Sequence, residues 1–91
     1  MANSKVLVKN DKAIVTEWSF KVGDSTGPHK HQYNYVVVPM MDGKLKIVNH
    51  DGEVSYSNLS KGVSYFRKKG VNHNVINDND FPYTFVEIEF K

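Results

Sequence analysis

Short apolar segments alternate with polar residues along this chain, and no stretch shows the 3.6-residue apolar period of an amphipathic helix. Val, Tyr, Phe, Thr and Ile are frequent, and Gly, Asn, Asp and Pro interrupt them at short intervals. This pattern is typical of an all-β protein. It predicts about eight strands, which we place at residues 6–8, 13–22, 30–40, 45–49, 54–59, 63–66, 71–76 and 82–91.

Tight turns are predicted between several of these strands. Asp42-Gly43 and Asp51-Gly52 are dipeptides that two-residue hairpin turns prefer. With 91 residues the chain can form only one hydrophobic core of useful size, and no linker or repeat divides it. We therefore expect a single domain, residues 1–91, folded as a small antiparallel β-barrel or β-sandwich.

Two of the expected strands make specific predictions about burial. Residues 36–38 are three consecutive valines, so apolar side chains lie on both faces of that strand and both faces should be covered. The cover could come from the chain's own loops or from a second copy in a homodimer. In the last strand, Val86, Ile88 and Phe90 have the pattern of a buried side, so Glu87 and Glu89 are expected to face outward.

The composition excludes several classes of protein. The chain has no cysteine, which rules out a disulfide framework and a thiol nucleophile. Its net charge is +2, and its densest basic cluster, Arg67-Lys68-Lys69, is interpreted as a solvated loop rather than a nucleic-acid contact. The first ten residues contain no long apolar run, so no signal peptide or membrane anchor is expected, and the cytoplasm is the expected location.

Two of the four histidines, His29 and His31, lie one residue apart. Residues two apart share a face of a strand, so both imidazoles point the same way if the strand has begun at His29. Tyr33 and Tyr35 continue that face. Two imidazoles on one face can bind the same metal ion, although an isolated His-x-His pair is usually incidental.

A third histidine, His73, lies in a matching context. The segment 23–43, which contains the His-x-His pair, and the segment 62–77, which contains His73, resemble the two motifs of the cupin superfamily. The stretches TGPHKHQYNYVVVPMMDG, YFRKKGVNHNVIN and FVEIEF further resemble small single-domain bacterial cupins that are labelled β-alanine degradation proteins. The resemblance implies a double-stranded β-helix, or jelly-roll, fold. It also implies one divalent transition metal (iron, nickel, manganese or zinc) held by His29, His31 and His73.

The chain departs from the first cupin motif at its glutamate, because the fourth residue after His31 is Tyr35. A phenol at this place could ligate the metal as a phenolate, move a proton, or only fill the core. The same alternatives apply to Tyr33. In the second motif, Lys68 replaces a turn proline.

Three residues outside the metal set complete the candidate chemistry. Arg67 precedes the second motif's turn and could bind a substrate carboxylate through its guanidinium, or could be a surface ion-pair partner. His50 belongs to neither motif and is expected on the surface, and Asn77 resembles the motif's structural asparagine.

The resemblance implies a metal-dependent enzyme of lyase, isomerase or dioxygenase type that acts on a small polar or carboxylate molecule. The alternatives are a cupin that binds a metal or small molecule without turnover, and a structural protein with a vestigial site.

Overall fold

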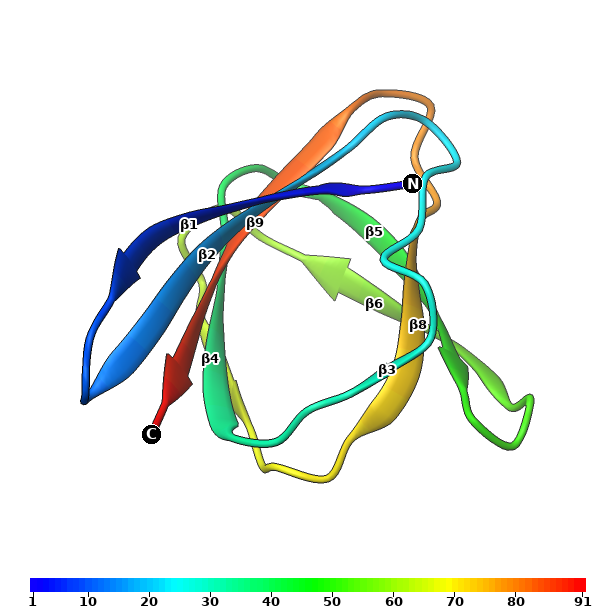
Figure 1. Cartoon of the computed structure of the whole chain (residues 1–91). Helices are drawn as coiled ribbons and strands as arrows, with labels where there is room; N and C mark the ends of the chain where they lie inside the picture. The colour runs from blue at the N-terminus through cyan, green and yellow to red at the C-terminus, as the bar shows by residue number, and fades with distance from the viewer.

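The computed structural model describes all 91 residues and contains nine strands in two antiparallel sheets. The first sheet consists, in spatial order, of β1 (Asn3–Lys9), β2 (Ala13–Phe20), β9 (Tyr83–Phe90), β4 (Asn34–Pro39) and β7 (Tyr65–Arg67). The second consists of β3 (His29–Lys30), β8 (Asn72–Asn77), β5 (Gly43–Asn49) and β6 (Val54–Leu59). The sheets form the walls of a barrel that is open at one end (Figure 1). The predicted all-β barrel is confirmed.

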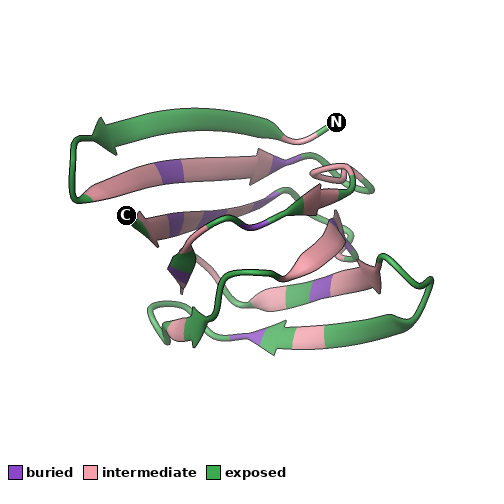
Figure 2. Cartoon of the chain, turned by 60° about the horizontal axis from the view of Figure 1, so that its bottom comes forward, coloured by how far each residue is buried: buried purple, intermediate pink, exposed green.

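The hydrophobic core lies between the two sheets. Its eight buried members are Phe20, Tyr35, Val37, Leu45, Leu59, Val75, Tyr83 and Phe85. Figure 2 shows that the buried positions of the first sheet lie on β2, β4 and β9, whereas β1 is exposed along its whole length. The structure contains no helix with the length and apolar character that crossing a membrane requires.

The strand predicted at 30–40 is two strands, because its halves pair in different sheets. His29 pairs with His73 in the second sheet, whereas Tyr35 pairs with Glu89 in the first. The chain crosses between the sheets at His31, whose N–H donates to the carbonyl of Val71 at 2.8 Å. This bond fixes His31 at the open end of the barrel.

One predicted hairpin is confirmed and the other is wrong. Asp51-Gly52 lies in the turn between β5 and β6, which pair with each other. Asp42-Gly43 joins β4 to β5, which belong to different sheets. Gly43 is required there because its backbone packs on the Tyr83 ring: a Cβ would lie 2.5 Å from a ring carbon.

The valine run at 36–38 has one buried face only. Val37 points into the barrel and is buried, whereas Val36 and Val38 lie half-buried on the outer face of the first sheet. Val36 pairs there with Phe66, whose side chain is 51% exposed. The chain's own loops therefore do not cover this outer face.

Candidate functional site

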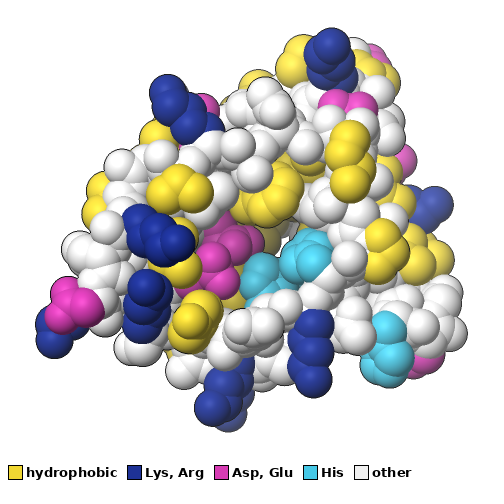
Figure 3. Space-filling view, in the orientation of Figure 1, with side chains coloured by type: hydrophobic (Ala, Val, Ile, Leu, Met, Phe, Trp, Pro, Cys, Tyr) yellow, Lys and Arg dark blue, Asp and Glu magenta, His cyan; other side chains and the backbone are white.

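Backbone pairing brings the three predicted histidines together. His29 on β3 lies directly opposite His73 on β8, so their side chains share one face of the second sheet. His31 reaches the same place from the crossing segment, and its side chain is buried. Figure 3 shows histidine and acidic side chains together in the hollow at the open end of the barrel.

The Nε2 atoms of the three imidazoles converge. His31 Nε2 lies 3.0 Å from His29 Nε2 and 3.2 Å from His73 Nε2. The Nδ1–H of His29 donates to the carbonyl of Gly27 at 2.9 Å, which leaves a lone pair on Nε2 of that ring. Burial, with the other histidines nearby, lowers the pKa of His31 to about 4, and burial with His29 and Arg67 lowers that of His73 to about 4. These two imidazoles are thus neutral at pH 7.

This arrangement fits a transition metal ion. Nitrogens bound about 2.1 Å from a tetrahedral zinc ion lie about 3.4 Å apart, which is close to the observed Nε2 separations of 3.0 and 3.2 Å. Neutral imidazoles are the protonation state that binds a metal. His29, His31 and His73 are therefore a set that could hold one ion.

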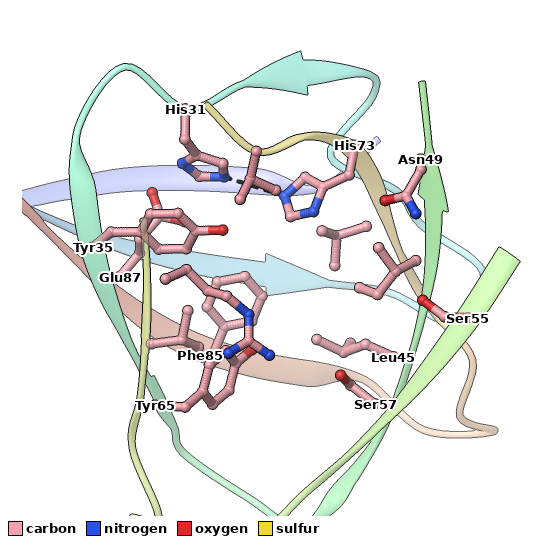
Figure 4. A pocket seen from close by; sticks show the side chains of 15 residues that line it. His31, Tyr35, Leu45, Asn49, Ser55, Ser57, Tyr65, His73, Phe85 and Glu87 are labelled. Atoms are coloured by element: carbon pink, nitrogen blue, oxygen red, sulfur yellow. Dashed lines mark hydrogen bonds between the residues drawn. The ribbon is translucent and has the colours of Figure 1, made fainter. Parts of the chain in front are cut away.

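Tyr35 packs against this set from below. Its ring stacks on the imidazole of His31, and its hydroxyl points toward the cavity (Figure 4). Burial, followed by the nearby charge of Glu87, raises the pKa of Tyr35 above its usual value. The side chain is therefore a neutral phenol at pH 7 in the absence of a cation.

The glutamates of β9 do not face outward, and that prediction is wrong. Glu87 is only 7% exposed and points into the barrel beside Tyr83 and Phe85, while Glu89 is half-buried on the same face. β9 is the central strand of its sheet, and its successive side chains point to opposite faces of that sheet. The apolar residues Val86, Ile88 and Phe90 therefore occupy the outer face. Charged side chains of a strand usually face solvent, but here the polar site lies inside the barrel and the glutamates of β9 point toward it.

A signal in the sequence could have revealed this parity. Tyr83 and Phe85 have the same parity in β9 as Glu87 and Glu89, and the four residues pair with Phe20, Trp18, Thr16 and Ile14 of β2. The two large aromatic residues, which are buried, are the signal that the glutamates share the inward face. Burial, with Glu89 next to it, raises the pKa of Glu87 to about 7.

A cavity of about 230 Å³ extends from the histidines into the barrel. Its polar side chains are His31, Tyr35, Asn49, Ser55, Ser57, Tyr65, Arg67, His73 and Glu87. The guanidinium of Arg67 lies 4.6 Å from the Tyr65 ring centre, and its Nη1 donates to the Phe66 carbonyl at 3.2 Å. Arg67 forms no ion pair with a carboxylate of this chain, so its remaining N–H groups are free to bind an anion.

The other predicted residues lie outside this cavity. Tyr33 lines a separate outer pocket, together with His29 and Glu89. His50 is exposed, as predicted. Asn77 is buried and its amide donates to the carbonyls of Lys21 and Phe81, which confirms a structural role.

Comparison with known proteins gives close relatives along nearly the whole chain. The cupin domain family model matches residues 16–89. "Beta-alanine degradation protein BauB" of Pseudomonas aeruginosa is 48% identical over 86 residues, which are 94% of this chain and 90% of that protein. The crystal structure of a cupin domain from Bordetella pertussis Tohama I is 48% identical with a TM-score of 0.95, covering 99% of this chain and 93% of that one.

More distant structures share the fold alone. An RmlC-like cupin family protein from Methanocaldococcus jannaschii has a TM-score of 0.79 at 14% identity, covering 99% of this chain and 80% of that one. The polyketide cyclase RemF from Streptomyces resistomycificus has a TM-score of 0.75 at 18% identity, covering 98% of this chain and 64% of that one.

Proposed function

Because this chain belongs to the cupin family, we propose that it is a metal-dependent enzyme that binds a small carboxylate inside its barrel. The observation that carries the proposal is the convergence of the three Nε2 atoms at one end of a cavity that also contains Arg67. In this proposal His29, His31 and His73 hold one divalent ion of iron, nickel, manganese or zinc.

The donor set determines what the ion can do. Three neutral imidazoles leave a divalent ion its full charge, and at least one position open, so the ion would polarise a bound oxygen strongly. Lyase, isomerase and dioxygenase reactions all use such an ion. The ion's charge also favours binding of an anionic substrate in the adjoining cavity.

Arg67 is proposed to bind the carboxylate. Its guanidinium is held against Tyr65 and keeps donors free, which is the arrangement that suits bidentate binding of a planar anion. The name of the Pseudomonas relative supports this substrate class, because β-alanine is itself a small carboxylate. Ser55, Ser57 and Asn49 line the same cavity and supply hydrogen bonds for the polar group at the other end of such a molecule.

Tyr35 is proposed to move a proton at the reacting end of the substrate. It replaces the glutamate of the family motif, it lies against His31, and its raised pKa favours a protonated phenol over a phenolate ligand. Tyr33 lines the separate outer pocket and not the inner cavity. For Tyr33 we therefore propose a role only in proton exchange with the outer pocket.

The proposal is tested by metal content and turnover together. We expect protein reconstituted separately with each of the four metals to retain about one ion per chain, and the variant His31→Ala to retain none. His50→Ala is the matched control, because His50 is an exposed histidine outside both motifs. Equal metal content in wild type and His31→Ala would contradict the site.

A panel of short carboxylates, including β-alanine, tests catalysis with the loaded protein. Product formation or oxygen consumption supports an enzyme. Tight carboxylate binding without either result supports the second candidate, a binding protein, which the absence of a carboxylate at position 35 also favours.

We also propose that two copies of the chain pair through the outer face of the first sheet. Cross-strand pairing aligns Val8, Val15, Ile88, Val36 and Phe66 in one apolar row across all five strands. Val8 is 49% exposed and Phe66 51% exposed. Since a face of this kind is complementary to itself, a twofold homodimer would bury it.

A further inference from the structure

Glu87 lies close to only one of the three proposed metal-binding histidines, His31. The three histidines form one group of potential ligands, and His31, Glu87 and Glu89 form a second, each with ligand atoms within 4.8 Å of one another. His31 is the only residue that the two groups share. In Figure 4 Glu87 reaches the His31 ring on the side away from His73.

The position of the His31 proton decides whether this ring can bind an ion. A neutral imidazole carries one proton, and its unprotonated nitrogen is the ligand. His31 Nε2 faces the other two histidines. An ion at that point therefore requires the proton of His31 to be on Nδ1.

A protonated Nδ1 beside a metal needs a hydrogen-bond acceptor. Metal-binding histidines almost always donate this N–H to a carboxylate, a backbone carbonyl or water. The carbonyl of Gly27 does this for His29. No backbone carbonyl accepts from the ring of His31, and the nearby acceptors are the carboxylates of Glu87 and Glu89.

We propose that Glu87 is the positioning residue for His31: its carboxylate accepts the Nδ1–H hydrogen bond and so holds Nε2 toward the metal. This inference rests on the proposed metal site. A carboxylate oxygen of Glu87 lies within 4.8 Å of a ring nitrogen of His31, so the acceptor is already beside this ring. Glu87 is chosen over Glu89 because it is buried and lines both the inner cavity and the outer pocket, whereas Glu89 lines only the outer pocket.

The test compares two replacements of Glu87 that differ in acceptor capacity. Glu87→Gln keeps a carbonyl oxygen that can accept from Nδ1–H, and Glu87→Met removes the acceptor at similar volume. Zinc affinity is measured by competition with a chromophoric chelator, and the protonated ring nitrogen of His31 is identified from 15N-histidine NMR spectra of the zinc-loaded full chain. Glu89→Met, which removes the acceptor at the other glutamate on the same face of the same strand, is the matched control.

We expect Glu87→Met to weaken zinc binding about 10- to 100-fold and to shift the Nδ1–H signal of His31. Glu87→Gln should retain most of the affinity and the signal, and Glu89→Met should match wild type. Equal affinity in Glu87→Met and wild type would overturn the role of Glu87. Equal loss in Glu87→Gln and Glu87→Met, with the His31 signal unchanged, would show direct ligation by the carboxylate and overturn it as well.

Two further outcomes distinguish failure of this inference about Glu87 from failure of the proposed metal site. A loss of affinity in Glu89→Met alone would assign the positioning role to Glu89 and overturn the choice of Glu87. Failure of wild-type protein to bind zinc, iron, nickel or manganese would overturn the metal site itself, and the inference with it.

Discussion

The imidazole of His31 lies face to face with the phenol ring of Tyr35, with ring centres 3.9 Å apart and planes inclined by 18°. Tyr35 is the first inward-facing residue of β4 and is almost fully buried. The residue that replaces the glutamate of the family motif therefore supports one of the histidines through its ring. Its hydroxyl, which points into the cavity, is left for chemistry.

The two parts of Tyr35 can be separated by mutation. Tyr35→Phe keeps the ring and its stack on His31 but removes the hydroxyl. We expect zinc affinity to stay at the wild-type level and the rate of product formation to fall about 10²- to 10⁴-fold, the usual contribution of a proton-transfer group. Chelator competition measures the affinity, and a product assay at saturating substrate measures the rate.

Tyr35→Ala is the companion variant, because it removes the ring as well. Truncation of a buried aromatic side chain costs about 3–5 kcal/mol of folding free energy, so its thermal unfolding temperature should fall. A large loss of zinc in Tyr35→Phe would instead make the phenol oxygen a metal ligand.

Arg67 is predicted to set the affinity for carboxylates. Arg67→Met removes the guanidinium while keeping an apolar stem against Tyr65. Hydrogen bonds to a charged group contribute about 1.5–3 kcal/mol, so the Kd for a short carboxylate should rise about 10- to 150-fold. Calorimetric titration measures it, and Lys68→Met, the exposed neighbour outside the cavity, is the control. Similar affinities in both variants would contradict the assignment.

The barrel and its histidines could be predicted from the sequence because both depend on local patterns. Strand residues alternate with a period of two, and turn residues mark the strand ends. His29, His31 and His73 have motif spacing, and the pairing of β3 with β8 brings them together. The strand pattern needs no knowledge of which strands are neighbours, and the resemblance to the two cupin motifs is what grouped His73 with the other two histidines before that pairing was known.

The errors arose where the identity of a strand's neighbours matters. The turn at Asp42-Gly43 has the composition of a hairpin, yet the next strand joins the other sheet. The inward face of β9 depends on its register with β2 and β4, which the sequence of β9 alone does not contain. The pattern of β9 alone therefore predicts Glu87 on the outside, although its carboxylate is buried within 4.8 Å of a His31 ring nitrogen.

The burial of the Glu87 carboxyl group should make the free energy of unfolding depend on pH. Burial raises its folded-state pKa from 4.5 to about 7. The associated stability is fully present below pH 4.5 and is lost as the pH rises through about 7. Glu87→Gln does not ionise, so with chelator present its unfolding temperature, relative to wild type, should increase between pH 4.5 and 7 and then level off.

His31 and His73 act in the opposite direction in both proteins. Their folded-state pKa values are lowered from 6.5 to about 4, so the stability that they contribute is lost as the pH falls from 6.5 through about 4. The difference between the two proteins largely removes this common effect. Glu53→Gln, at an exposed turn, controls for the loss of one acidic group. A temperature difference that is constant from pH 4.5 to 8 would contradict the raised pKa.

The outer face of the first sheet is predicted to hold two copies together. Phe66→Glu places a charge at the exposed end of the apolar row, next to Val36. Burying that charge in a dimer would cost several kcal/mol, so light scattering after size exclusion should give a dimer mass for wild type and a monomer mass for the variant.

Tyr56→Glu is the matched control, because Tyr56 is 57% exposed on β6 of the other sheet. A monomer mass for wild type would contradict the proposed pairing. Dissociation by Tyr56→Glu alone would place the interface on the second sheet.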